Sequence, residues 1–145
     1  MALIPLISSE VAGPLGAIHL PRLWSKLLTS SAGQLEAGYD ECGGGFDQMT
    51  LDGLKVDRDA AVGFVKSNKP TYAAFEAWIL EQRGGSIPSS EIEASNAAIR
   101  GYNHADDTRK EILDGAGIAD NGSILDAVNL NNLEDWTELH SAVTG

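Results

Sequence analysis

Residues 19–54 read HLPRLWSKLLTSSAGQLEAGYDECGGGFDQMTLDGL, and the first third of this stretch predicts an amphipathic helix. Its apolar residues follow the spacing of a single helix face. They are Leu20, Leu23, Trp24, Leu27 and Leu28. Pro21 falls in the first turn, where the missing N–H is not needed, and Gly33 is suited to end the helix. We therefore expect a helix from Leu20 to about Gly33.

The rest of the sequence predicts further short helices and no sheet. Several segments carry apolar residues at helical spacing and end at glycine or before proline. No segment alternates between apolar and polar residues over the length of a strand. Residues 1–17 contain two prolines and two glycines, so we expect an extended N-terminal arm there. We predict an all-α fold: the arm, then a compact bundle of five to seven short helices in one domain, residues 18–145.

The ends of the later helices are predicted from capping residues and glycines. Residues 34–50 are expected to form a glycine-rich loop, and the last helix to begin near Asn131. Ser90 and Glu93 have the spacing of a capping box. The other predicted N-caps are Asp57 or Asp59, Thr71, and Asn103 or His104. The three tryptophans lie on apolar helix faces and are expected in the core: Trp24, Trp78 and Trp136.

The charge balance of the chain limits the kinds of partner that it is expected to bind. The 145 residues include 10 basic and 21 acidic side chains, for a net charge of −11. Nucleic acids and anionic membranes attract basic proteins, so neither is an expected partner. No apolar run approaches the ~18 residues of a membrane span, and no signal peptide is recognised. The single Cys42 excludes an internal disulfide, and we expect a cytoplasmic protein.

Two cations stand out in this acidic chain, because Arg22 and Lys26 lie one helical turn apart. Like charges at this spacing repel, unless a carboxylate or an anionic ligand lies between them. One interpretation is a site for a small anionic or polar molecule, bound by both cations. The alternative is an ion network that stabilises the fold, with a carboxylate from the next loop. The candidates for that carboxylate are Glu36, Asp40 and Asp47.

Tyr39 and Asp40 are the candidate catalytic residues. A tyrosine held near a cation can have a lowered pKa, and an aspartate can orient it, so the two can act as acid and base. The alternative is a loop tyrosine that packs on the helix, with Asp40 capping a turn. Other residues expected to contribute to the pocket are Trp24 as an apolar wall, His19, and Asn96, a polar residue on an apolar helix face.

Cofactor and metal sites are not predicted. Cys42 precedes three glycines whose N–H groups can bind an anion, but no histidine is placed beside it by the sequence. The run is therefore interpreted mainly as a hinge. His19, His104 and His140 are scattered without the spacing of a metal motif, although a mixed site that includes Asp40 is conceivable.

The segments LPRLWSK, AGQL, Tyr39-Asp40, LDGL and EAWILEQ resemble the DUF 5069 family of uncharacterised bacterial proteins. The resemblance covers roughly residues 18–113. It implies a small cytoplasmic helical protein and no particular reaction. The positions that match the pattern of the family are Leu20, Arg22, Lys26, Gly33, Tyr39, Trp78 and Asn96.

Two functions remain open from the sequence. The first is a cofactor-independent lyase, isomerase or hydrolase, in which Arg22 and Lys26 hold the substrate and Tyr39 with Asp40 moves a proton. The second is a non-catalytic module that binds a ligand or a partner in the same cleft. Apolar residues of the arm can also pack against a second copy in a homodimer: Leu3, Ile4 and Leu6.

Overall fold

The computed structural model describes residues 2–145, and in this range it contains seven α-helices and only isolated bridges of β type. The predicted all-α fold is confirmed. The helices are α1 (Leu20–Ser31), α2 (Phe46–Leu54), α3 (Arg58–Asn68), α4 (Tyr72–Gln82), α5 (Ser89–Arg100), α6 (Asp106–Ala116) and α7 (Ala127–Thr144). Within the described residues, no helix is both long enough and apolar enough to cross a membrane.

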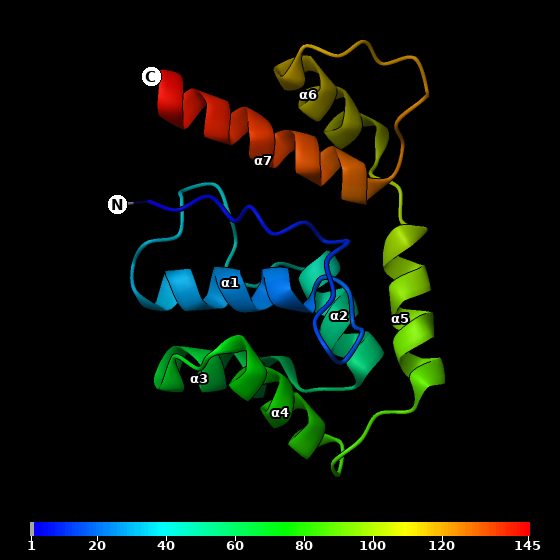
Figure 1. The fold of residues 1–145 in the computed structure, drawn as a ribbon. Coiled ribbons are helices and arrows are strands. Elements are labelled where there is room, and N and C mark those ends of the chain that lie inside the picture. The colour runs from blue at the N-terminus through cyan, green and yellow to red at the C-terminus, as the bar shows by residue number, and fades with distance from the viewer. Residues whose placement is uncertain (1) are drawn as a thin grey trace.

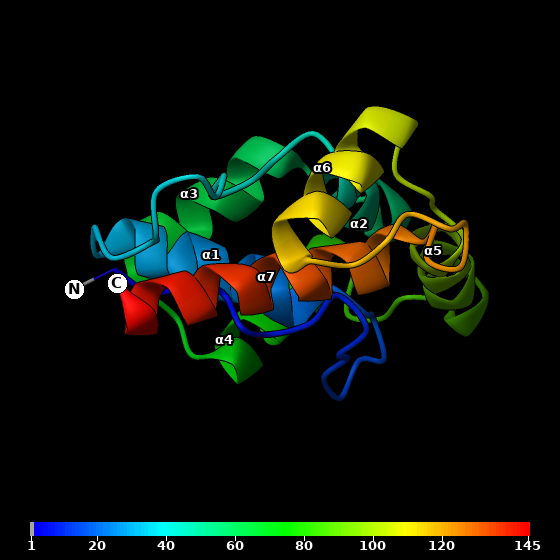
Figure 2. The same ribbon diagram turned by 90° about the horizontal axis from the view of Figure 1, so that it is seen from above.

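Helix α1 lies at the centre of the bundle (Figure 1). It packs against α3 and α4 on one side and contacts α2, which packs in turn against α5. Helices α6 and α7 form a separate pair above α1 and run in roughly the same direction, and α7 is joined to the rest of the bundle by contacts with α5. Figure 2 shows that α7 crosses over α1, with the N-terminal arm running beside both.

The apolar core consists of three clusters, which follow the grouping of the helices. The predicted leucine face of α1 is buried, with Leu20, Leu23 and Leu27 at 0% exposure in the main apolar cluster. A second cluster joins α2, α5 and the start of α7 around Phe46 and Ile99. A third, smaller cluster lies between α6 and α7. The α6–α7 pair therefore rests on the bundle through a small apolar contact, which leaves room for polar contacts beside it.

Backbone hydrogen bonds hold the start of the N-terminal arm against the segment that follows α1. Within the described part of the predicted arm, which excludes Met1, the N–H of Leu3 donates to the carbonyl of Gln34 over 2.6 Å. The N–H of Glu36 donates back to the carbonyl of Leu3 over 3.0 Å. Leu3 and Leu6 are exposed, and the homodimer that they suggested stays a prediction.

Several predicted helix ends are confirmed. The side chain of Asp57 caps α3 by accepting from the N–H of Ala60, and Thr71 caps α4 through the N–H of Ala74. Gly117 ends α6 with a positive φ of 74°, a conformation that glycine adopts without steric cost.

Other ends differ from the prediction. Helix α2 begins at Phe46, inside the predicted loop, because the Phe46 ring is buried in the second cluster. Helix α5 begins one residue before Ser90, and no side chain caps it, so the capping box does not form. Helix α6 is preceded by Ala105 rather than capped by Asn103 or His104. Helix α7 begins at Ala127, four residues early, because Asp126 caps it through the N–H of Asn129.

The prediction that all three tryptophans lie in the core is wrong for Trp136. Trp24 and Trp78 pack against the main cluster. Trp136 is 57% exposed on the outer face of α7. Periodicity shows which residues share a helix face, but not whether another element covers that face.

Candidate functional site

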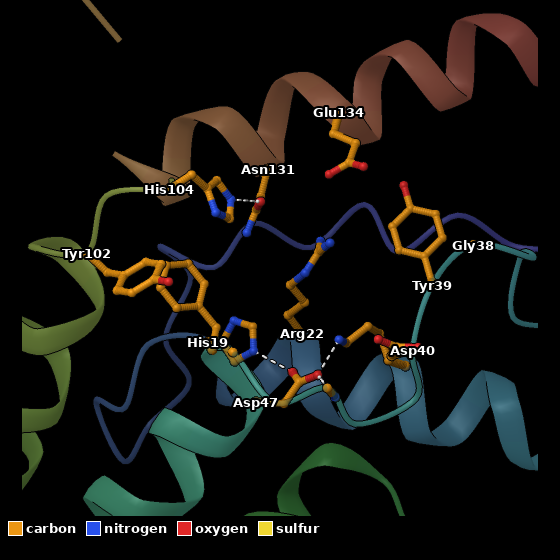
Figure 3. A pocket seen from close by; sticks show the side chains of 14 residues that line it. His19, Arg22, Gly38, Tyr39, Asp40, Asp47, Tyr102, His104, Asn131 and Glu134 are labelled. Atoms are coloured by element: carbon orange, nitrogen blue, oxygen red, sulfur yellow. Dashed lines mark hydrogen bonds and ion pairs between the residues drawn. The ribbon is translucent and has the colours of Figure 1, made fainter. Parts of the chain in front are cut away.

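A cavity of about 270 Å³ lies where the α6–α7 pair meets the rest of the bundle. Its walls come from α1, the glycine-rich loop, the start of α2, the segment between α5 and α6, and α7 (Figure 3). Five of the predicted site residues line it: His19, Arg22, Lys26, Tyr39 and Asp40. Trp24 and Asn96 do not line this cavity. The sequence therefore identified one wall of the pocket, and the opposite wall comes from distant segments.

Arg22 is paired with a carboxylate of the protein itself. Its guanidinium group forms a bidentate ion pair with the carboxylate of Asp135 on α7, with N–O distances of 2.7 and 3.0 Å. The same group donates to the carbonyls of Pro5 and Ile7 in the arm, at 2.8 and 2.9 Å. Both partners of the ion pair are buried. Arg22 thus connects α1, the arm and α7, and this role matches the fold-stabilising interpretation more closely than anion binding.

Lys26 is also paired. Its ammonium lies 2.5 Å from one carboxylate oxygen of Asp47, which also accepts from the N–H of Gly43 over 2.7 Å. The other oxygen of Asp47 lies 2.6 Å from Nε2 of His19. Burial alone disfavours the charged carboxylate, but His19 and Lys26 outweigh it and lower the pKa of Asp47 to about 2. The carboxylate is therefore ionised at neutral pH and neutralises Lys26.

His19 has no free ring nitrogen for a ligand. Burial lowers its pKa and favours the neutral ring, although Asp47 opposes this effect. In the neutral ring, Nε2–H donates to Asp47, and Nδ1 accepts from the Ser9 hydroxyl over 2.9 Å. Its backbone has a φ of 70°, which residues other than glycine rarely adopt. These buried contacts hold His19 in that conformation at the start of α1.

The hydroxyl of Tyr39 binds a different carboxylate from the predicted one. It donates to Asp135 over 2.9 Å, and the acidic partner of Tyr39 is therefore Asp135 rather than its neighbour Asp40. Burial, strengthened by the negative charge of Asp135, raises the pKa of the Tyr39 hydroxyl. A raised pKa makes the hydroxyl a weaker acid, so it stays protonated at neutral pH. Tyr39 thus adds a hydrogen bond to the carboxylate that Arg22 neutralises.

Two carboxylates at the rim of the cavity lack a cationic partner. Asp40 is exposed on the loop, and Glu134 projects from α7 on the facing wall (Figure 3). Within residues 2–145, neither forms an ion pair. Partial burial and the adjacent Asp135 raise the pKa of Glu134. A raised pKa indicates an environment in which the negative charge of Glu134 is poorly compensated.

Aromatic rings cover one side of the cavity. Phe46 meets Tyr102 edge to face with ring centroids 5.8 Å apart, and Tyr102 meets His104 in the same way at 6.1 Å. Nε2 of His104 lies 2.7 Å from the side-chain oxygen of Asn131 on α7. The cavity therefore combines aromatic surface with carboxylates, a combination that suits a positively charged group.

Trp24 and Asn96 have structural contacts elsewhere. The indole N–H of Trp24 donates to the carbonyl of Pro70 over 3.0 Å, at the start of α4. The Asn96 side chain accepts from the N–H of Ile18 over 3.0 Å and donates to the carbonyl of Gly16 over 2.8 Å. Asn96 thus fastens α5 to the arm, one of the two roles expected for a polar residue on an apolar face.

The glycine run is fixed by local contacts. Arg58 donates to the carbonyls of Cys42 and Gly43, and the N–H of Gly43 donates to the carboxylate of Asp47. Burial raises the pKa of the Cys42 thiol, which disfavours the nucleophilic thiolate. Within residues 2–145, no group of three or more histidine, cysteine or acidic side chains is arranged to hold a metal ion.

The residues that the sequence did not identify come mostly from the second half of the chain. Asp135 lies 113 residues after Arg22, and no local pattern connects the two. The others line the cavity: Phe46, Tyr102, Asn131 and Glu134. Only the bundle arrangement brings these residues together.

Comparison with models of protein families, and with curated proteins, gives no match to this chain. The resemblance to the DUF 5069 family stays a prediction. The basis for a functional proposal is therefore the chemistry of the pocket residues: two cations that are already neutralised, two unpaired carboxylates and an aromatic wall.

Proposed function

We propose that the protein is a binding module whose pocket takes a small polar molecule with a positively charged group, such as an amine or an alkylammonium. The observation that carries this proposal is the pairing pattern. Arg22 and Lys26 are each neutralised by a buried carboxylate, whereas Asp40 and Glu134 face the cavity without a cation. The ligand would supply the missing positive charge.

The pairing pattern argues against the anionic ligand that Arg22 and Lys26 suggested. An anion would have to displace Asp135 or Asp47, and breaking a buried ion pair costs about 3–5 kcal/mol. It would also approach the negative charges of Asp40 and Glu134. A cation meets neither obstacle, because it leaves both buried pairs intact.

The shape and lining of the cavity support a small ligand. A volume of about 270 Å³ corresponds to about nine water molecules and lies just below the usual range of ligand pockets. The rings of Tyr102 and Phe46 both line this space and contact each other edge to face. A cation over an aromatic face gains about 0.5–2 kcal/mol, depending on how fully water is excluded.

The geometry supports binding more than catalysis. General acid–base catalysis needs a group whose pKa lies near the working pH and whose proton faces the ligand. The Tyr39 hydroxyl points at Asp135 and its pKa is raised, and both nitrogens of His19 are occupied. The catalytic role of Tyr39 and Asp40 stays an alternative hypothesis.

The test is a calorimetric titration of the protein with tetramethylammonium and, in parallel, with propionate. We expect binding of the cation alone. Glu134→Gln and Asp40→Asn should each weaken it about three- to fivefold, as expected for partly exposed charge pairs. The matched control is Glu138→Gln, which removes a charge one turn further along α7, outside the cavity.

The pH dependence provides a second readout. Because the pKa of Glu134 is raised, this carboxylate is neutralised at a higher pH than an ordinary glutamate as the pH falls. Cation binding should therefore weaken on acidification in the wild type and change less in Glu134→Gln. Binding of propionate but not tetramethylammonium would overturn the proposal and restore the anionic ligand.

A further inference from the structure

The last turns of α7 carry an exposed apolar face outside the pocket. Trp136, Leu139 and Val143 are 57%, 39% and 76% exposed. Their spacing of three and four residues places them on one face of the helix. Single exposed apolar residues are common, but three on one face form a contiguous patch of the kind that marks interaction surfaces. We call these three residues the α7 stripe.

The segment of the chain that carries the stripe is strongly acidic. Residues 101–145 contain nine acidic and two basic side chains, and α7 contains no lysine or arginine. Of the two basic residues, Arg109 is paired with Asp106 and Asp120. Trp136 borders a groove that also includes Asp114, near the end of α6. The stripe is therefore apolar surface on an acidic segment, with Asp114 at the edge of the groove beside it.

We propose that the α7 stripe binds an amphipathic helix of a partner protein whose apolar face is flanked by lysine or arginine. Apolar side chains of that helix would cover Trp136, Leu139 and Val143. A basic residue of that helix would lie over Asp114, which borders the same groove as Trp136. Such a helix lying in a shallow groove is a common form of protein recognition.

Charge complementarity selects this occupant over the alternatives. A second copy also carries a net charge of −11, so pairing two α6–α7 units would bring two acidic segments together. An anionic membrane surface would be repelled for the same reason. The stripe is small, since one tryptophan and two aliphatic residues dominate it, so we expect a micromolar, transient interface.

This surface is distinct from the pocket of the proposed function. Glu134, which lines the pocket, lies two residues before Trp136 and hence on the nearly opposite side of α7. The groove beside Trp136 is lined by α6, Gly117 directly after it, and α7. Failure of one proposal therefore leaves the other intact.

The test uses the whole protein and a fluorescent model peptide of about 18 residues, built from leucine and lysine with all leucines on one helix face. Two control peptides replace lysine by glutamate, or scatter the same leucines around the helix. We expect micromolar binding of the first peptide only, measured by fluorescence anisotropy at physiological salt.

Variants then locate the binding surface. Trp136→Ser with Val143→Ser should weaken binding about tenfold or more, because buried aromatic residues dominate interfaces. Val11→Ser serves as the matched control, since it removes another exposed apolar side chain, 45% exposed, from the arm. Leu139→Ser provides an independent second variant on the stripe.

Three results would overturn the proposal. The first is equal binding of either control peptide. The second is unchanged affinity in the stripe variants, with their folded state confirmed by circular dichroism. The third is a wild-type dimer in sedimentation that the stripe variants lose, which would assign the stripe to a second copy.

Discussion

Asp47→Asn tests whether the buried ion pair of the pocket stabilises the fold. Asn keeps the shape of Asp47 but removes the charge that neutralises Lys26 and binds His19. Lowering the pKa of Asp47 from 3.8 to about 2 corresponds to about 2 kcal/mol of stability at neutral pH. Leaving Lys26 buried without a partner adds to this, up to the 3–5 kcal/mol typical of a broken buried pair.

The pH dependence of this loss has a definite sign. The pKa of Asp47 is lower in the folded state than in the unfolded chain, so its stabilisation is complete above about pH 5 and is lost as the pH falls toward 2. Urea unfolding of wild type and Asp47→Asn should therefore differ by about 2–5 kcal/mol at neutral pH, and the difference should shrink steadily in acid.

The matched control is Asp52→Asn, which removes an exposed carboxylate from the same helix. It should change stability by less than about 0.5 kcal/mol. The reasoning is refuted if Asp47→Asn costs less than about 1 kcal/mol at neutral pH, or if its cost is the same at neutral pH and about pH 3.

Three further substitutions test the contacts around the pocket. Arg22→Gln leaves Asp135 buried without a full charge partner, so we expect a loss of about 3–5 kcal/mol in chemical unfolding, whereas a loss below about 1 kcal/mol would contradict the pairing. Tyr39→Phe should cost only about 1 kcal/mol, because Arg22 still holds Asp135, and it should leave cation affinity within about twofold. A substrate turnover abolished by Tyr39→Phe would instead establish the catalytic hypothesis. Asn96→Ala should cost about 1–3 kcal/mol by leaving the N–H of Ile18 without its acceptor, and an unchanged melting temperature would show that the arm is not fastened there.

The fold was largely predictable because its main signal is local. The leucines of α1 recur at helical spacing within a dozen residues, and the structure buries them as expected. The side chains of Asp57 and Thr71 act within three residues of their own position, so the helix starts that they cap were also visible. The start of α2 at Phe46 was missed because burial against distant segments, rather than a local pattern, stabilises it.

The site was only half predictable for the same physical reason. The sequence placed Arg22, Lys26 and Tyr39 together because they lie close along the chain, and it included Asp47 among the candidate partners. It could not show that Asp135, 113 residues away, neutralises Arg22. That single contact changes the expected ligand, because a paired arginine no longer attracts an anion.

The most direct test of the central claim is an NMR measurement of where tetramethylammonium binds. The claim is that the aromatic and acidic cavity between α1 and α7 receives the positive charge. It predicts intermolecular nuclear Overhauser effects from the methyl protons of the cation to the ring protons of Tyr102 and His104. Contacts only with Trp136, or none with the protein at all, would contradict it.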